Sequence, residues 1–409
     1  MFQTMFKQHP RKWLGMGTAL LAAISLMGLA GCITGGGGAD AGAAITRTSD
    51  PAASKDAKAV QKYLAALTRG TEPGVVAGQN AGDGPEIARF SDQVGYFSLL
   101  DSVQQASGQT PGMVGVDYEH DSIYTPEQLS LANQRLIEHW KRGGLVTISW
   151  SPHSPWLNDE RDIAGHPGEW ADTQTKSHDP GRIDLRELLD PSQPRHAVWR
   201  RKLDRVAAAL QELQQAGVVV LWRPMAEMNG DSFWWGQASS PQDPELYKAV
   251  WRDMHRYLTQ AKGLHNLLWV YSPYRGPVNA AEAAYIRPVD WAYPGAELVD
   301  VVAGVSYSDT LDIADYAAYL SFGKPVAMGE YGLTLQGSAS LDGSFDTTRY
   351  IQRLQQDYPA VAYWVSWHNW SIDGERVEHQ ALTSQRNVTA LMQAPATITR
   401  SRVKWKAYR

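Results

Sequence analysis

Residues 218–235 read VVVLWRPMAEMNGDSFWW. Apolar residues open this segment, and such a run is typical of a strand that is buried on both faces. Charged and aromatic residues follow at once, among them Arg223 and Glu227. An unpaired charge at the end of a buried strand costs several kcal/mol. The two residues are therefore either a structural ion pair or part of a site.

A second segment further along the chain has the same design. Residues 324–332 (KPVAMGEYG) pass from an apolar run into a single carboxylate, Glu330, which lies between Gly329 and Gly332. The chain is also rich in aromatic side chains that carry a polar group, with 16 Trp and 18 Tyr against 7 Phe. Such rings stack on pyranose rings, although a large fold also buries many of them. Two carboxylates at two strand ends in this chain predict a pair that acts on a sugar.

The charge and the cysteine content exclude several function classes. A formal net charge of −5 over 409 residues predicts neither a nucleic-acid partner nor an acidic polymer. The single cysteine excludes a disulfide framework and a cysteine-based metal site. Residues 117–121 (DYEHD) could resemble a metal cluster, but neighbours along a strand point to opposite faces, so we interpret them as a solvated loop. We expect no metal and no organic cofactor.

The N-terminus has the pattern of a signal that ends at the cysteine. Basic residues precede the apolar run 14–30, and residues 29–32 (LAGC) resemble a bacterial lipobox, in which cleavage frees the cysteine for lipid attachment. A membrane-spanning helix is the alternative, but the run is short and interrupted. We expect a signal peptide at 1–31, a lipid bilayer contact through acylated Cys32, and a flexible tether at 32–55. The expected location is the bacterial cell envelope, at the outer membrane.

Beyond the tether, short apolar runs alternate with amphipathic segments. The apolar runs are 74–80, 112–119, 145–152, 218–228, 267–274, 299–308, 325–332 and 361–370. Helical patterns lie between them, and strand and helix alternating in this way predict a single (β/α)₈ TIM barrel over residues 56–395. A doubly wound open sheet is the alternative, but neither of its phosphate-binding glycine motifs occurs in the chain. Residues 396–409 are expected to form a basic C-terminal tail.

The barrel interpretation makes a further prediction about position. Active sites of such barrels lie at the carboxyl ends of the strands. Polar and aromatic residues should therefore gather at the ends of the apolar runs, as they do at Asn80, Asp117, Tyr118, His153, Arg223, Glu227, Tyr307, Glu330 and Trp367. Glycosidic bond cleavage needs one carboxylic acid to protonate the leaving oxygen and one carboxylate to attack or to activate water. Glu227 and Glu330 are the candidates for this pair.

The segment WRPMAEMNGDSFWW resembles the acid/base segment of glycoside hydrolase family 26, and GEYG fits the nucleophile strand of that family. The resemblance covers about residues 56–395 and implies a retaining barrel enzyme. By position, Glu227 would be the acid/base and Glu330 the nucleophile. Arg223 and Tyr307 would hydrogen-bond the nucleophile and keep it ionised.

The same resemblance implies a set of substrate-binding residues. His153 would lie near the sugar whose bond is cleaved, and Trp367 would form the platform beneath that sugar. Trp234 or Trp235 would wall the leaving-group side, and Trp156 would line the donor side. Asn229 and Asp117 complete the expected substrate-binding set. The connection 158–195 is long, and we expect it to close one side of the donor subsites.

One position departs from the family pattern. Mannanases of this family carry a histidine immediately before the acid/base, whereas this chain has Ala226. The resemblance still favours endo-hydrolysis of β-1,4-mannan. Other members resemble β-1,3-1,4-glucanases, β-1,3-xylanases or hydrolases of bacterial exopolysaccharide, and these alternatives stay open. From a different class, a carbohydrate-binding lipoprotein without turnover also remains, although the presence of both glutamates argues against it. We expect a monomer whose partner is a polysaccharide substrate.

Overall fold

The computed structural model describes residues 45–81, 98–119, 125–157, 173–174, 183–236, 243–372 and 375–409. The expected signal peptide, Cys32 and most of the expected tether lie outside the described residues, as does most of the connection 158–195. Those expectations therefore stay predictions. Within the described ranges, no helix has both the length and the apolar character that a membrane crossing requires.

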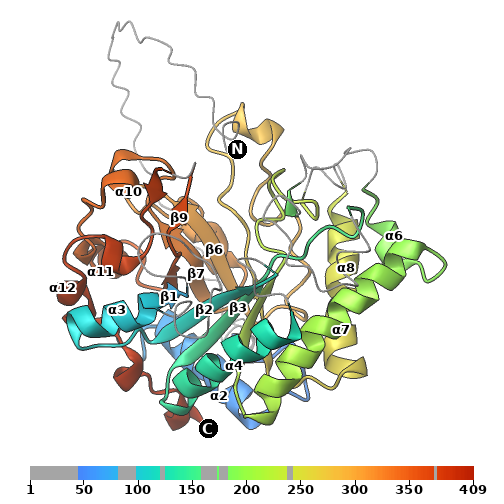
Figure 1. Cartoon of the computed structure of the whole chain (residues 1–409), viewed down its shortest axis with the longest axis horizontal. Helices are drawn as coiled ribbons and strands as arrows, with labels where there is room; N and C mark the ends of the chain where they lie inside the picture. The colour runs from blue at the N-terminus through green and yellow to red at the C-terminus, as the bar shows by residue number, and fades with distance from the viewer. Residues whose placement is uncertain are drawn as a thin grey trace, which may run out of the picture.

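Eight parallel strands close into a barrel, which confirms the predicted fold (Figure 1). Each strand pairs with the next, and β1 pairs with β8 to complete the ring, with Val76 opposite Tyr363. The strands are β1 (Val75–Asn80), β2 (Met113–Tyr118), β3 (Leu145–Trp150), β4 (Val220–Pro224), β5 (Leu267–Tyr271), β6 (Val301–Tyr307), β7 (Val326–Gly332) and β8 (Val361–Ser366).

Helices surround the ring of strands, and their ends follow local sequence signals. Thr125 caps α4 in a capping box with Gln128, because its hydroxyl accepts from the Gln128 N–H while the Gln128 side chain accepts from the Thr125 N–H. The helices are α2 (Lys55–Thr68), α3 (Ser98–Ser107), α4 (Pro126–Lys141), α6 (Arg186–Leu189), α7 (Pro194–Gln215), α8 (Pro244–Arg256), α9 (Tyr316–Ser321), α10 (Ser338–Asp342), α11 (Thr348–Gln356) and α12 (Val388–Gln393).

Short elements complete the described fold. The short strands are β9 (Trp370–Ser371), β10 (Val377–Glu378) and β11 (Thr397–Ile398). The π-helical turn η5 (Tyr257–Ala261) extends α8. The 3₁₀ turns are η6 (Glu282–Ala284), η7 (Leu382–Ser384), η8 (Arg400–Arg402) and η9 (Trp405–Tyr408).

Much of the tryptophan content belongs to the core. The largest fully buried side chains include Trp150, Trp199, Trp222, Trp234, Trp235, Trp251, Trp269, Trp364 and Trp405. Trp150 stacks between Trp199 of α7 and Trp222 of β4, at ring-centre distances of 5.3 and 5.9 Å. These rings fill the space between the barrel and its helical layer, where aromatic side chains contribute large buried areas. The Trp count alone is therefore weak evidence for sugar binding.

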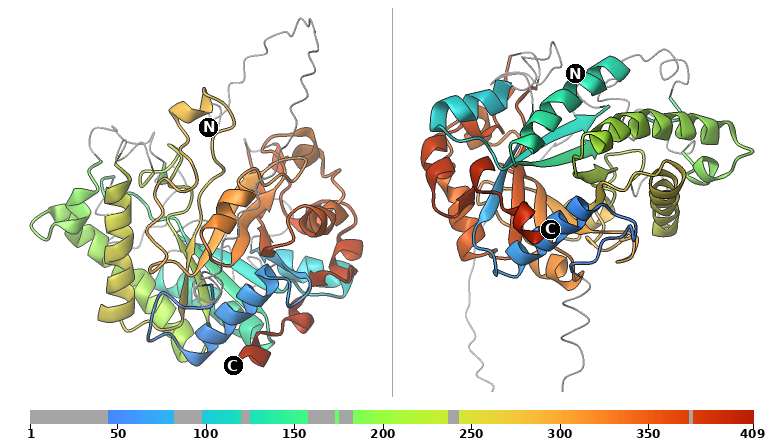
Figure 2. Two further views of the ribbon diagram at one scale, coloured as in Figure 1. Left: turned by 180° about the vertical axis from the view of Figure 1, so that it is seen from behind. Right: turned by 90° about the horizontal axis from the view of Figure 1, so that it is seen from below.

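The folded domain extends beyond both predicted boundaries. Ahead of residue 56, the Ser49 backbone N–H and hydroxyl both donate to Asp300 beneath the barrel. At the other end, β11 pairs with β1, and Trp405 is buried in a stack on Trp140 with ring centres 4.5 Å apart. The predicted boundaries at 55 and 396 are thus wrong for the described residues, because both segments cover the amino-terminal ends of the strands (Figure 2).

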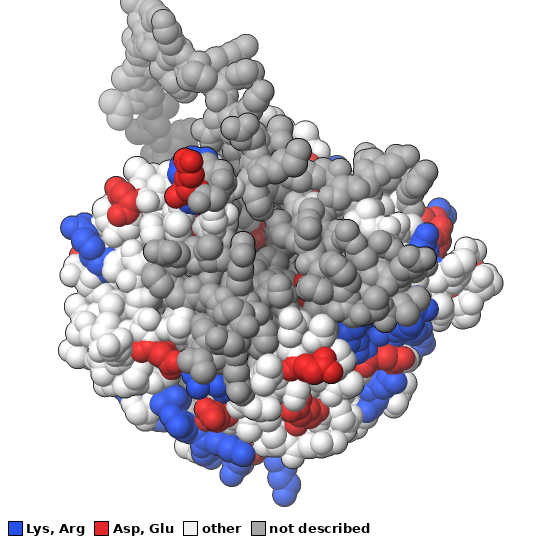
Figure 3. Space-filling view, viewed as in Figure 1, with Lys and Arg blue, Asp and Glu red and all other residues white. Residues whose placement is uncertain are grey.

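The surface carries charges of both signs. On the face drawn in Figure 3, Lys and Arg side chains lie among Asp and Glu side chains rather than in one field of a single sign. This distribution fits the small net charge of the chain.

Candidate active site

Glu330 is held inside the barrel mouth by two groups from other strands. Its Oε1 accepts from Nη1 of Arg223 at 2.9 Å, and its Oε2 accepts from the Tyr307 hydroxyl at 2.6 Å. The side chains of Arg223 and Glu330 are only 4% and 12% exposed, so water screens the pair weakly. Charge-assisted bonds of this kind are short and strong, and they hold the carboxylate in a fixed direction. The expected contacts of Arg223 and Tyr307 with Glu330 are present.

Gly329 makes room for this arrangement. The register between β6 and β7 shifts at this point, so that Val305 faces Glu330 and residue 329 is left over as a bulge. A Cβ on Gly329 would lie 3.0 Å from Cδ of Arg223 and 3.0 Å from Oγ of Ser272. A side chain there would displace the arginine that holds Glu330. Glycine at 329 therefore fits a closely packed position, and a left-handed φ is not the reason for it.

Glu227 follows β4 in a strained turn. Both Met225 and Glu227 have a positive φ, at 48° and 59°, which side-chain-bearing residues rarely adopt. The turn is held because the Glu227 N–H donates to the Ser272 carbonyl at 2.8 Å, after β5. Such strain is common where a backbone aims a functional side chain.

The proton affinity of Glu227 is unusual. Partial burial and the negative charge of Glu330 together raise its pKa from 4.5 to about 8, while Arg223 opposes the shift. Glu227 therefore holds a proton at neutral pH, whereas Glu330 accepts hydrogen bonds from Arg223 and Tyr307. One proton donor and one oriented carboxylate, each set by its surroundings, form the pair that acid/base and nucleophilic catalysis require.

Trp367 and Asp117 lie around Arg223. The guanidinium lies over the Trp367 ring, 5.8 Å from its centre, at the end of β8. Asp117 is buried and accepts from the N–H and the hydroxyl of Ser151, at 3.1 and 2.9 Å, and its charge reaches Arg223. Trp367 is partly exposed and so remains available as a platform. Asp117 instead holds the β3 end, and its expected contact with substrate stays a prediction.

His153 lies beside a buried ionic cluster that the sequence did not reveal. Glu119 is 2% exposed and has a φ of 71°. It contacts Lys202 and Arg205 of α7 at 3.3 and 3.4 Å, and it accepts from the His153 N–H at 2.9 Å. Burial opposes ionisation of Glu119, yet Lys202, His153 and Arg205 together lower its pKa. The solvated-loop interpretation is therefore wrong for Glu119, and also for Asp117, which is buried within β2.

Two other parts of that interpretation have different outcomes. Residues 120 and 121 lie outside the described residues. In the described parts of the chain, no group of acidic, His or Cys side chains is arranged to hold a metal ion. A signal for the buried cluster did exist, because Lys202 falls at the spacing of the apolar face that Val198 and Val206 define.

Asn229 binds loops rather than solvent. Its Nδ2 donates to the carbonyls of Tyr274 and Arg287 at 2.9 and 2.8 Å, and its Oδ1 accepts from the Tyr274 N–H at 2.8 Å. The side chain is fully buried. These contacts use its two N–H groups and its oxygen, so Asn229 clamps both ends of the β5 loop to the turn that carries Glu227. The expectation that it binds substrate directly is not supported by this geometry.

The three other expected tryptophans lie together on the same side. Trp234 and Trp235 are fully buried, and their Nε1 atoms donate to the carbonyls of Pro152 and Ala226 at 2.7 and 2.8 Å. Neither ring presents an open face, so their predicted role as a subsite wall stays a prediction. Trp156 is partly buried, packs edge-on against Trp234 and donates to Glu187 at 3.0 Å.

Sequence reasoning missed the residues that follow β5. Tyr274 is partly buried, and burial followed by the charge of Glu227 raises its pKa. Arg275 lies next to it and forms an ion pair with Glu282 at 2.5 Å. The strand-end rule could have found them, because the run 267–274 ends at this tyrosine. They border Glu227 on its β5 side.

Comparisons with known proteins agree with this geometry. The model of glycosyl hydrolase family 26 matches residues 49–400. The chain is 34% identical to the mannan endo-1,4-beta-mannosidase A and B of Caldalkalibacillus mannanilyticus, over 80% of this chain and 59% of that protein. It is 31% identical to the mannan endo-1,4-beta-mannosidase of Bacillus subtilis (strain 168), over 79% of this chain and 82% of that protein. A Bacillus subtilis mannanase structure superposes with a TM-score of 0.68 at 26% identity, covering 86% of this chain and 95% of that one.

Replacing Asn229 should loosen the turn of Glu227. We expect Asn229→Ala to lower the free energy of unfolding by about 2–4 kcal/mol, because three buried backbone groups lose their partner. The matched control is Asn279→Ala on the same loop, where an exposed side chain caps Ala281 and Glu282 and a change of about 1 kcal/mol or less is expected. Urea unfolding followed by fluorescence measures both. Equal stability of the two variants would contradict the clamp.

Proposed function

Since the chain belongs to glycosyl hydrolase family 26, we propose that it is an endo-β-mannanase that cleaves β-1,4-mannosidic bonds by double displacement. The chain is a glycoside hydrolase, and a polysaccharide substrate is consistent with its mannanase relatives. The observation that supports the mechanism is that the two carboxyl groups have different surroundings. Arg223 and Tyr307 bind Glu330, while Glu227 holds a proton.

In the first step, the Glu330 carboxylate attacks the anomeric carbon and the glycosidic C–O bond breaks. The proton of Glu227 passes to the departing oxygen, so that the leaving chain departs as a neutral alcohol. Arg223 and Tyr307 fix the direction of the attacking oxygen and need not move. The product of this step is an ester between the sugar and Glu330, with Glu227 now ionised.

The second step depends on the coupling between the two carboxyl groups. The charge of Glu330 is one of the two causes that raise the pKa of Glu227. Esterification removes that charge, so the proton affinity of Glu227 falls and its carboxylate becomes suited to accept a proton from water. Water then attacks the anomeric carbon, the ester bond breaks, and Glu330 returns as a carboxylate. One glutamate thus serves as acid and then as base without a change of position.

The relatives supply the argument for mannan. Both proteins compared above are named as mannan endo-1,4-beta-mannosidases, and the Bacillus subtilis protein aligns over most of its length. The alternative of a β-1,3-1,4-glucanase, β-1,3-xylanase or exopolysaccharide hydrolase keeps one specific observation in its favour. Ala226 carries no polar side chain, and its carbonyl is occupied by Trp235. The sugar hydroxyl at that point must then be read by another residue.

Substrate choice is tested by reducing-sugar release on linear mannan, glucomannan, lichenan and β-1,3-xylan, measured side by side with the same protein. We expect mannan and glucomannan to be cleaved at least tenfold faster than the other two, because one well-placed hydrogen bond is worth about that factor. Release from lichenan alone would replace the mannan proposal with the glucan alternative. If the protein with Glu227 and Glu330 intact released no reducing sugar from any of the four substrates, the exopolysaccharide or binding alternatives would be favoured.

Replacing each of the two glutamates with glutamine tests the mechanism. We expect Glu227→Gln to lower kcat/KM on mannan about 10²–10⁴-fold, yet to spare cleavage of an aryl mannoside with a strongly acidic leaving group. Such a substrate should show a burst of aryl alcohol, since the second step lacks its base. The alkaline limb of the pH profile near pH 8, where Glu227 loses its proton, should also disappear.

Two further variants serve as controls for that experiment. Glu330→Gln should abolish cleavage of both mannan and the aryl mannoside, because no leaving group replaces a missing nucleophile. Glu245→Ala, on the exposed start of α8, is the matched control and should leave kcat/KM unchanged. A Glu227→Gln variant that retains full activity on mannan would remove the acid/base role from this residue.

We further propose that the protein acts as a monomer tethered to a bilayer through acylated Cys32. The support is the sequence alone, namely the lipobox-like residues 29–32 after a basic and apolar leader. Labelling with a clickable palmitate analogue should mark the wild-type protein and not Cys32→Ala. The variant should also move from the membrane fraction to the soluble fraction. Equal labelling of both would contradict lipid attachment at this residue.

A further inference from the structure

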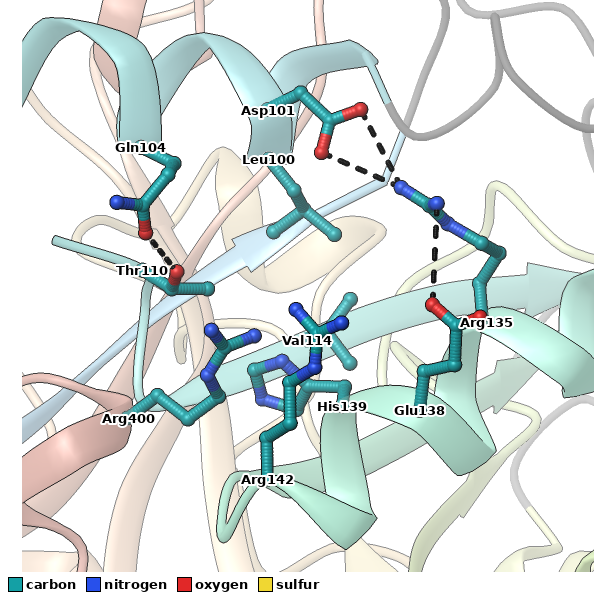
Figure 4. A pocket seen from close by; sticks show the side chains of 10 residues that line it. All are labelled: Leu100, Asp101, Gln104, Thr110, Val114, Arg135, Glu138, His139, Arg142 and Arg400. Carbon is teal, nitrogen blue, oxygen red and sulfur yellow. Dashed lines mark hydrogen bonds and ion pairs between the residues drawn. The ribbon is translucent and has the colours of Figure 1, made fainter. Parts of the chain in front are cut away.

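A cavity of about 350 Å³ opens on the flank of the barrel, between α3, α4 and the C-terminal segment (Figure 4). Its lining includes Arg135, Arg142, His139, Thr110 and Arg400. Thr110 precedes β2, Arg142 precedes β3, and the Arg400 N–H donates to the Thr110 carbonyl at 2.9 Å. The basic part of the cavity therefore lies at the amino-terminal ends of the strands, on the rim opposite Glu227 and Glu330. The proposed reaction does not use it.

The arginines that line the cavity differ in their partners. Arg135 forms ion pairs with Asp101 at 3.3 Å and with Glu138 at 4.0 Å. In the described part of the chain, the guanidinium groups of Arg142 and Arg400 make no hydrogen bond or ion pair, and both point into the cavity (Figure 4). Two cations therefore face the same cavity, whose two carboxylates, Asp101 and Glu138, pair with Arg135 instead.

The charges of the two arginines act on the neighbouring titratable groups. Partial burial and then the charge of Arg142 lower the pKa of Arg400. Burial, followed by the charges of Arg400 and Arg142, lowers the pKa of His139 to about 3, so this imidazole is neutral at physiological pH. Arg142 is exposed and Arg400 is partly exposed, so water weakens the repulsion between them without removing it. A bound anion would relieve the repulsion.

The helix dipole explains only one of the two cations. Arg142 is the C-cap residue of α4, where a basic side chain is favoured by the carbonyl end of the helix. Arg400 arrives from a different segment, after β11, and has no such reason to lie there.

We propose that Arg142 and Arg400 form a binding site for a phosphate group, free or as a phosphomonoester. Planar guanidinium groups bind oxyanions through paired N–H donors. Two unpaired positive charges match a dianion, and a phosphate carries about −1.5 to −2 charges at pH 7, whereas a carboxylate carries one. On the same wall the Thr110 hydroxyl donates to the Gln104 side-chain oxygen, which leaves the Gln104 amide N–H groups as neutral donors.

Calorimetric titration of the purified full chain tests the site, with inorganic phosphate added at constant ionic strength. We expect saturable one-to-one binding to the wild type, and binding at least tenfold weaker in Arg142→Met and in Arg400→Met. Arg400→Lys keeps the charge but loses the paired donors. Its affinity for phosphate should therefore lie between that of the wild type and that of Arg400→Met. Lys141→Met is the matched control, because it removes an exposed positive charge beside Arg142 and does not line the cavity.

Three ligands define the chemistry and its source. Acetate should bind at least tenfold more weakly than phosphate; equal affinity would overturn the match to a dianion. Glucose 6-phosphate that binds more tightly than phosphate would identify an esterified phosphate as the ligand, and equal affinity would identify the free anion. No phosphate binding to the wild type, or equal binding by the Met variants and Lys141→Met, would overturn the site. All variants should keep the wild-type rate on mannan, which shows that they are folded.

Discussion

Arg223 and Glu330 come from strands that are not neighbours in the sheet, and they meet inside the barrel at 2.9 Å. A buried ion pair adds little net stability, but the loss of one partner leaves a buried charge that costs about 3–5 kcal/mol. The surroundings are arranged around this constraint. Gly329 has no side chain because Arg223 occupies that space, and Tyr307 satisfies the second oxygen of Glu330. A contact that contributes little to stability thus determines the residues at several neighbouring positions.

The same site stores strain at the second glutamate. A positive φ at Met225 and at Glu227 costs about 1–3 kcal/mol each. The cost is offset by bonds that tie the turn to the β5 loop, from the Glu227 N–H to Ser272 and through the Asn229 side chain to Tyr274. The turn holds Glu227 where burial and the charge of Glu330 raise its pKa. Strain, proton affinity and loop attachment are therefore parts of one arrangement.

The sequence was sufficient where a pattern is local. The apolar runs predicted the eight strands, and the polar residues that end them predicted the contacts of Glu330, because parallel strands of a barrel bring their carboxyl ends together. It was insufficient where burial depends on distant segments. Trp234 is of a residue type that often stacks on sugars, but it is a core residue here. Glu119 was predicted to be solvated, but it is buried and pairs with Lys202 of α7. No local sequence pattern shows whether a distant segment of the chain will cover an aromatic ring.

The two rims of the barrel contribute differently to stability. The carboxyl-end rim holds the strained turn and the buried charges, features that reduce stability. The opposite rim is closed by segments from both ends of the chain, through Ser49 on Asp300 and Trp405 on Trp140. Closure of this rim by the C-terminal segment also brings Arg400 to the cavity that Arg142 lines. The proposed phosphate would supply the counter-charge for these two cations, so that the rim that closes the fold would also hold a ligand.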